Sequence, residues 1–208
     1  PPLDERGNSV RGIRVCNELS RVFDLHLFNR PSVGKSTIRL KFTGADINSS
    51  RVRRPEEVQA LRQHGGGIQV YQLQGNLTFA TAEVVVHEIM QNLDAITHLI
   101  LDLKRVVTLN DSTARLFHEL LEKFAGTSRN MLFTHAARLP LLRRCLKARL
   151  GDRYGELYRA FEDNDPALEW CEDRVLEVHL PRPEPDRSCA PGDYELFASL
   201  TAAEIATI

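Results

Sequence analysis

The run best suited to chemistry at first sight is residues 32–37, which read SVGKST. A glycine, a lysine and a hydroxyl in this order are typical of phosphate-binding loops, where backbone N–H groups and the lysine amine hold the phosphates. That loop also requires a glycine at position 29, where Asn29 stands, and a helix directly after it. The residues that follow alternate apolar and basic side chains, as a strand does, so we interpret the run as a connecting turn.

The same run places Ser32 three residues before Lys35, a spacing that puts a lysine amine beside a serine nucleophile in some amidohydrolases. That arrangement needs a helix, which Pro31 and Gly34 oppose. His64 and the three glycines after it are similar to an esterase oxyanion loop, but no Gly-x-Ser-x-Gly motif accompanies them. We therefore assign no catalytic residue to this chain and expect it to be inactive alone.

A further candidate is the loop at residues 110–114, NDSTA, which leads into a predicted helix. A phosphate on Ser112 or Thr113 would lie at a helix N-terminus, where backbone N–H groups and the helix dipole favour an anion. The charge of Asp111 would oppose it. The alternative is that Asp111 or Ser112 caps the helix, a contribution of about 1 kcal/mol. Ser112 and Thr113 are thus candidates for phosphorylation, with capping as the other interpretation.

The remaining composition excludes several classes of protein. The 208 residues include 27 Lys and Arg against 28 Asp and Glu, a balance that favours neither nucleic acid nor an anionic membrane surface as partner. The apolar runs are too short to span a bilayer. None of the four cysteines (Cys16, Cys145, Cys171 and Cys189) has Cys-x-x-Cys spacing, so we expect reduced thiols, a cytoplasmic location and no metal or cofactor.

The elements that would position these residues begin with an amphipathic helix at residues 9–23 and a strand at residues 37–42. Pro55 can open a short helix at residues 56–63, and the glycines that follow end it. The composition changes there, so we expect a domain boundary near residue 65.

Beyond residue 65 the pattern alternates regularly. Strands are expected at residues 68–73, 98–103 and 130–135, and helices at 81–94, 112–125, 139–150 and from Asp165 onward, with Asp165 as N-cap and Pro166 next. In the first of these helices we expect Val84, Val85 and Ile89 to face inward. Such alternation predicts an α/β fold with a largely parallel sheet.

Residues 1–28 resemble the end of the catalytic domain of bacterial glutaminases. The family pattern Ser-Pro-x-Leu-Asp…Gly-Asn-Ser-x-x-Gly is matched by Leu3, Asp4, Gly7, Asn8, Ser9 and Gly12, with Pro2 directly before Leu3. The resemblance implies a β-lactamase-like enzyme that hydrolyses L-glutamine to L-glutamate and ammonia through a lysine-activated serine. Those catalytic residues precede the motif, so none falls on this chain.

Residues 66–180 resemble a STAS domain, the fold of anti-sigma factor antagonists. The resemblance rests on the order of elements, on the Gly75-Asn76-Leu77 turn and on the 110–114 loop. In the antagonists this loop reads Asp-Ser-Ser-Gly and its second hydroxyl is phosphorylated; here Thr113 takes that place and Ala114 replaces the glycine. Residues 194–208 resemble the first helix of a cyclic-nucleotide-binding domain.

Together these resemblances imply five segments. They are a glutaminase remnant with a helix and a strand (1–44), a linker (45–65), the STAS domain (66–180), a linker rich in proline (181–193) and the start of a cyclic-nucleotide-binding domain (194–208). We expect a regulatory segment that binds a protein partner or its own glutaminase domain, with L-glutamine a ligand of the complete enzyme only. The alternative is a STAS interaction module of the antagonist type, switched by Ser/Thr phosphorylation.

Overall fold

The computed structural model describes residues 36–180 and residue 204. The helix expected at residues 9–23, the linker at 181–193 and all of the 194–208 segment except Glu204 lie outside the described residues. The described part is an α/β unit around one five-stranded sheet, whose strand order follows the chain from β1 to β5. The strands are β1 (Ile38–Thr43), β2 (Ile68–Leu77), β3 (His98–Leu109), β4 (Asn130–Thr134) and β5 (Arg159–Phe161).

Strands β2 to β5 are parallel, and β1 pairs antiparallel with β2. Parallel neighbours need crossover connections, and these are almost always right-handed. Because the strand order never reverses, every crossover helix falls on the same face. That face carries α3 (Phe79–Gln91), α4 (Asp111–Ala125), α5 (Pro140–Leu150) and the single turn α6 (Tyr154–Leu157).

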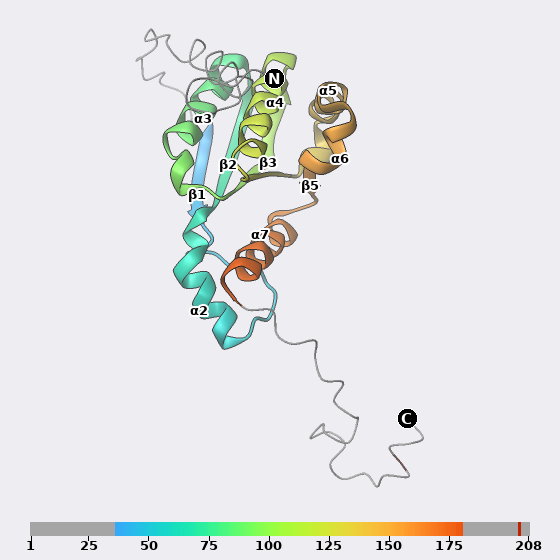
Figure 1. The fold of residues 1–208 in the computed structure, drawn as a ribbon. Helices are drawn as coiled ribbons and strands as arrows, with labels where there is room; N and C mark the ends of the chain where they lie inside the picture. The colour runs from blue at the N-terminus through green and yellow to red at the C-terminus, as the bar shows by residue number, and fades with distance from the viewer. Residues whose placement is uncertain (1–35, 181–203, 205–208) are drawn as a thin grey trace, which may run out of the picture.

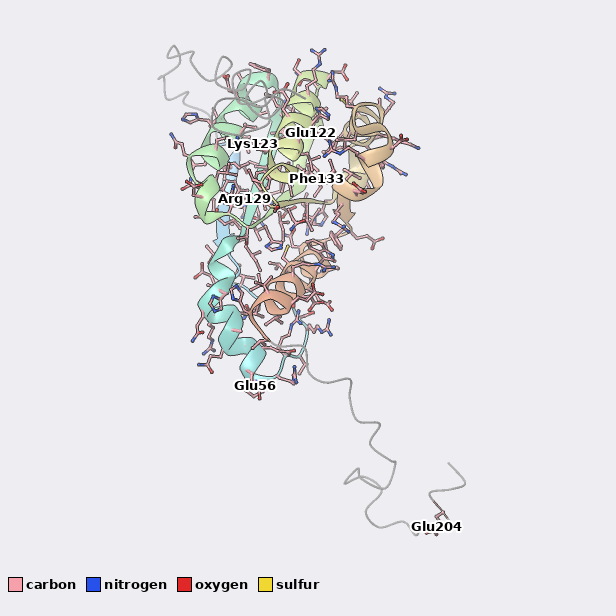
Figure 2. The ribbon with its side chains drawn as sticks, viewed as in Figure 1. Glu56, Glu122, Lys123, Arg129, Phe133 and Glu204 are labelled. Carbon is pink, nitrogen blue, oxygen red and sulfur yellow. The ribbon has the colours of Figure 1, made fainter. Side chains whose placement is uncertain are left out.

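The opposite face is covered by α2 (Pro55–His64) and α7 (Asn164–His179), which pack against each other (Figure 1). The central strand β3 is therefore buried on both sides. Its Leu99 and Leu101 pack under the crossover helices, and Ile100 points to α2 and α7. Phe133 of β4, labelled in Figure 2, is fully buried in the crossover-helix layer. Such two-sided burial explains why β4 and the first half of β3, residues 98–103, are mostly apolar.

The domain boundary expected near residue 65 is wrong for the part of the chain that the structure describes. Strand β1 is an edge strand of the same sheet, paired with β2 from Ile38 opposite Leu73 to Thr43 opposite Gln69. Helix α2 buries Ala60 and Leu61 in the same core as α7. Residues 38–64 thus belong to the STAS-like unit, because antiparallel pairing and burial join them to it.

Backbone approach at Gly44 and Gly65 fixes this junction. A Cβ on Gly65 would lie 2.8 Å from the carbonyl oxygen of Gly44, and a Cβ on Gly44 would lie 2.9 Å from that of Gly65. Only glycine permits such contact between the end of β1 and the start of β2. The glycines read from the sequence as a boundary signal are therefore a packing feature.

Several expected details differ in the structure. Residues Gly75 and Asn76 do not end the strand: Gly75 has φ +80 and β2 continues through a register irregularity to Leu77. Val84 is exposed, and Val86 takes the inward position. Asp163, instead of Asp165, caps α7 and accepts from the Asp165 N–H. The turn α6 and strand β5 were not predicted, because both are too short to show a period.

No helix within the described residues is long and apolar enough to cross a membrane.

Acid should destabilise the fold through His98. Its side chain is buried, with Nδ1 2.9 Å from the Thr97 hydroxyl, and burial, with a smaller contribution from Arg174, lowers its pKa to about 4. The unfolded chain binds this proton near pH 6.5 and the folded chain only near pH 4, so stability falls as the pH decreases between these values. From pH 7 to pH 5 we expect a loss of about 2 kcal/mol.

Urea unfolding of the chain and of His98→Leu at pH 7 and pH 5 measures this contribution. The variant should lose about 2 kcal/mol less than the parent chain over this pH interval. Equal losses would show that His98 does not carry the acid sensitivity.

Candidate functional site

The loop before α4 is organised by Asn110. Its side-chain oxygen accepts a hydrogen bond from the Thr113 N–H at 2.9 Å, which makes Asn110 the N-cap. The cap expected at Asp111 or Ser112 is thus one or two residues too late. Asn110 has extended backbone with φ −101 and ψ 170, the usual N-cap conformation.

The two candidate hydroxyls of this loop have different surroundings. Thr113 is fully buried, and its hydroxyl donates to the carbonyl oxygen of Leu77 at 2.9 Å. Leu77 ends β2, so this bond ties the first turn of α4 to the sheet. Ser112, one residue earlier, is exposed. An anion could be added at Ser112 with the fold intact, whereas at Thr113 the helix would first have to open.

A second polar group, buried between the sheet and α7, was missed in the sequence. Asp102 accepts from the Asn164 amide at 2.9 Å and from the Lys104 N–H at 2.9 Å, and lies 3.1 Å from His135 Nδ1. Thr134 donates to the Asn164 side-chain oxygen at 2.6 Å. These residues are 62 positions apart at most and show no sequence spacing that could have found them. The group fixes the start of α7 against β3 and β4.

A third group, which we call the serine–arginine clasp, joins the segment after β1 to α7. Ser49 donates both its N–H and its hydroxyl to Glu172, each at 2.6 Å. Ser50 does the same to Asp165, at 2.6 and 2.7 Å. Helix α7 carries four carboxylates on this side: Asp165, Glu169, Glu172 and Asp173. The serine hydrogen bonds and the positive charges of the arginines at 51 and 53 reduce the electrostatic free energy of placing them together.

The arginines of the clasp complete it. Arg53 binds Glu172 at 3.0 Å and Asp173 at 2.5 Å, and its side chain is only 6% exposed, with Glu172 at 0%. Arg51 binds Glu169 and Asp173 on the exposed side, at 2.7 and 3.3 Å. The sequence contains no signal for the partners of these arginines, which lie more than a hundred residues away. The clasp holds residues 49–53 on the helix that leads to the end of the described unit.

Within residues 36–180 and 204, no three or more His, Cys, Asp and Glu side chains are grouped so that they could hold a metal ion. The cysteines described, Cys145 and Cys171, are free, and burial raises the pKa of the Cys171 thiol.

Residues 59–138 match the family model of the STAS domain. The match begins in α2 and ends before α5, so it covers the strands β2 to β4 and the loop with Ser112 and Thr113. The α/β architecture and the family match together make this part of the chain similar to a STAS domain.

The curated relatives of the chain are glutaminases. Glutaminase 2 of Bradyrhizobium diazoefficiens is 31% identical over all 208 residues, which make up 33% of that protein. Glutaminase 1 of the same organism is 27% identical over the same length and share. A glutaminase of a Nostoc species is 65% identical over 34 residues, 16% of this chain and 10% of that protein. The chain therefore spans about a third of the length of the first two relatives.

Solved structures give weaker likenesses. One, described as Mglu, is 28% identical with a TM-score of 0.34 and covers 64% of this chain and 28% of that one. The anti-sigma factor antagonist SpoIIAA in its unphosphorylated form is 17% identical with a TM-score of 0.41, covering 53% of this chain and 90% of that one.

Proposed function

We propose that this chain is the regulatory part of a glutaminase, and that the complete protein hydrolyses L-glutamine to L-glutamate and ammonia. The observation that supports it is the alignment of all 208 residues with Glutaminase 2 of Bradyrhizobium diazoefficiens, of which they form a third. The STAS match lies inside that alignment. A catalytic domain in the remaining two thirds would supply the residues that this chain lacks.

The finer assignment follows from the resemblances in the sequence. We place a serine-dependent, β-lactamase-like catalytic domain before the STAS unit, ending within residues 1–35, and the start of a cyclic-nucleotide-binding domain at residues 194–208. The complete protein would act in the cytoplasm. Strand β1 and α2 belong with the STAS unit, so the linker at 45–65 is withdrawn from this arrangement.

The STAS unit would act by binding, either to a protein partner or to its own catalytic domain. The clasp supports the second possibility, because it fixes the segment next to β1, the strand closest to the preceding domain in the chain. Movement of a preceding domain would then be transmitted to α7 rather than absorbed by a loose linker. Phosphorylation of the antagonist type remains an alternative at Ser112, which is exposed at the start of α4.

The activity is tested by producing the complete protein and measuring ammonia release from L-glutamine. We expect turnover by the complete protein and none by the 208-residue chain. A folded complete protein without turnover would overturn the enzymatic part of the proposal. Cross-linking of the complete protein through the exposed amines of Lys41, Lys104 and Lys147, with mass spectrometry, tests the contact between domains. Links confined to the STAS unit would exclude the catalytic domain as its partner.

A further inference from the structure

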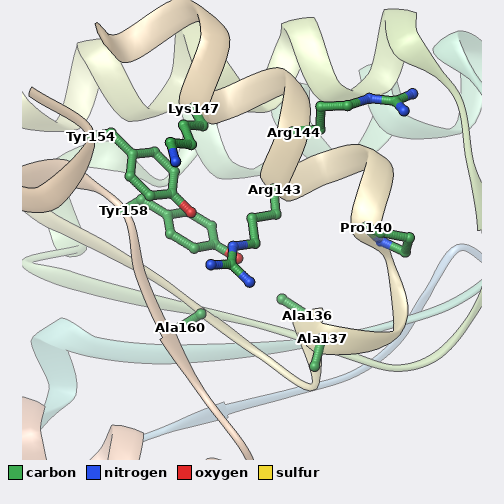
Figure 3. A pocket seen from close by; sticks show the side chains of 9 residues that line it. All are labelled: Ala136, Ala137, Pro140, Arg143, Arg144, Lys147, Tyr154, Tyr158 and Ala160. Atoms are coloured by element: carbon green, nitrogen blue, oxygen red, sulfur yellow. The ribbon is translucent and has the colours of Figure 1, made fainter. Parts of the chain in front are cut away.

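A pocket of about 660 Å³ lies beside α5 and opens to solvent (Figure 3). One wall is α5, with Arg143, Arg144 and Lys147; the other is formed by Tyr154 and Tyr158, around α6. Small side chains, three alanines and a proline, make up the rest of the lining. In Figure 3 the guanidinium of Arg143 and the amine of Lys147 lie on the tyrosine side, and Arg144 points away from it.

The charged side chains that line this pocket are all positive. Its lining contains three cations and no carboxylate. Arg143, Arg144 and Lys147 form no ion pair among the described residues, whereas Arg51, Arg53 and Arg153 all have carboxylate partners within 4 Å. Arg143 and Lys147 are four residues apart, so they are neighbours on one helix face and repel each other. A bound anion would remove that repulsion.

The tyrosine wall is rigid and can donate hydrogen bonds. The rings of Tyr154 and Tyr158 are stacked with centroids 4.9 Å apart, and Tyr158 packs on the buried Phe133 at 5.6 Å. Burial raises the pKa of Tyr158 to about 12, and the neighbouring Tyr154 adds to the effect. At neutral pH the phenol therefore keeps its proton and can donate to an oxyanion.

We propose that this pocket binds a small organic dianion, either a phosphate monoester or a dicarboxylate. Arg143 and Lys147 would bind the charged oxygens, since guanidinium and ammonium groups bind both classes. The tyrosine rings and the alanines would contact the carbon part of the ligand, as apolar walls do in small-molecule sites. None of the residues that line the pocket belongs to the loop before α4. The proposal does not depend on whether the complete protein hydrolyses glutamine.

The test is isothermal titration calorimetry of the 208-residue chain at constant ionic strength, with phenyl phosphate and, separately, with glutarate as the titrant. At least one probe should bind with saturation, and Arg143→Gln/Lys147→Gln should weaken it tenfold or more. The matched control Arg62→Gln/Arg105→Gln removes the same charge from exposed positions outside the pocket lining and should change binding less than twofold. Tyr158→Phe, which keeps the ring and removes the hydroxyl, tests the hydrogen bond from the phenol and should also weaken binding.

The two probes distinguish the two classes of ligand. Binding of phenyl phosphate alone would assign a phosphate monoester, and binding of glutarate alone would assign a dicarboxylate. Equal loss in the pocket variant and in the control would mean nonspecific attraction and would overturn the proposal. Binding of an oligo-glutamate peptide without binding of either small dianion would also overturn it, in favour of a surface for an acidic protein segment. Thermal unfolding of each variant checks that the fold is unchanged.

Discussion

Replacing Arg53 by methionine should lower the free energy of unfolding by about 3–5 kcal/mol. The side chain of Glu172 is 0% exposed and has Arg53 as its cationic partner at 3.0 Å, so the variant leaves a buried carboxylate without a counter-charge. Ser49 still donates two hydrogen bonds to Glu172, but neutral donors compensate a buried charge only in part. Urea unfolding monitored by circular dichroism measures the loss.

Two companion variants separate charge burial from the loss of a side chain. Arg51→Met removes two exposed ion pairs, with Glu169 and Asp173, and should cost less than about 1 kcal/mol. The double variant Arg53→Met/Glu172→Leu removes both buried charges and should recover part of the stability, because apolar pairs often replace buried ion pairs without loss. If Arg53→Met and Arg51→Met had the same small effect, the clasp would not contribute to the stability of the unit.

The sequence was sufficient for the elements that carry a clear period. The helix at α4 was predicted almost to the residue, because Leu116, Phe117, Leu120 and Phe124 recur on one buried face. Strand β3 was predicted too short, ending at Leu103 instead of Leu109, since its second half is mostly exposed and buries only Val106, so it shows no strand period. Periodicity finds an element when one face is buried along its whole length.

The grouping of elements into one unit was harder to predict. Three glycines after α2 were interpreted as a domain boundary, yet Gly65 marks a close contact with Gly44 inside the unit. Composition cannot distinguish these cases, because a glycine needed for flexibility and one needed for close packing look alike. The pairing of β1 with β2 is a contact between segments about 30 residues apart, which no local pattern contains.

The candidate sites also differ in whether their residues are close together in the sequence. The loop with Ser112 and Thr113 was found because a cap and a helix start leave a local signal, although the capping residue proved to be Asn110. The clasp and the Asp102 group were missed because each joins residues from distant segments. The pocket at α5 also depends on Tyr154 and Tyr158, which lie around a turn too short to predict.

Replacing Thr113 by glutamate should destabilise the chain by about 3–5 kcal/mol. The new carboxylate would occupy a site that is fully buried and would remove the hydrogen bond to the Leu77 carbonyl. Thr113→Val keeps the shape and loses only that bond, so about 1 kcal/mol is expected, because the Leu77 carbonyl keeps its hydrogen bond from the Asn110 N–H at 3.4 Å. Urea unfolding of the three proteins at pH 7 gives the comparison.

Ser112→Glu is the matched control, because it adds the same charge one residue earlier, where the side chain is exposed in the first turn of α4. The helix dipole favours an anion there, and Asp111 opposes it, so stability should change by less than about 0.5 kcal/mol. Phosphorylation would then be compatible with the folded unit at Ser112 and would require opening of α4 at Thr113. Equal tolerance of glutamate at both positions would mean that the first turn of α4 opens readily, and Thr113 would regain its place as a candidate.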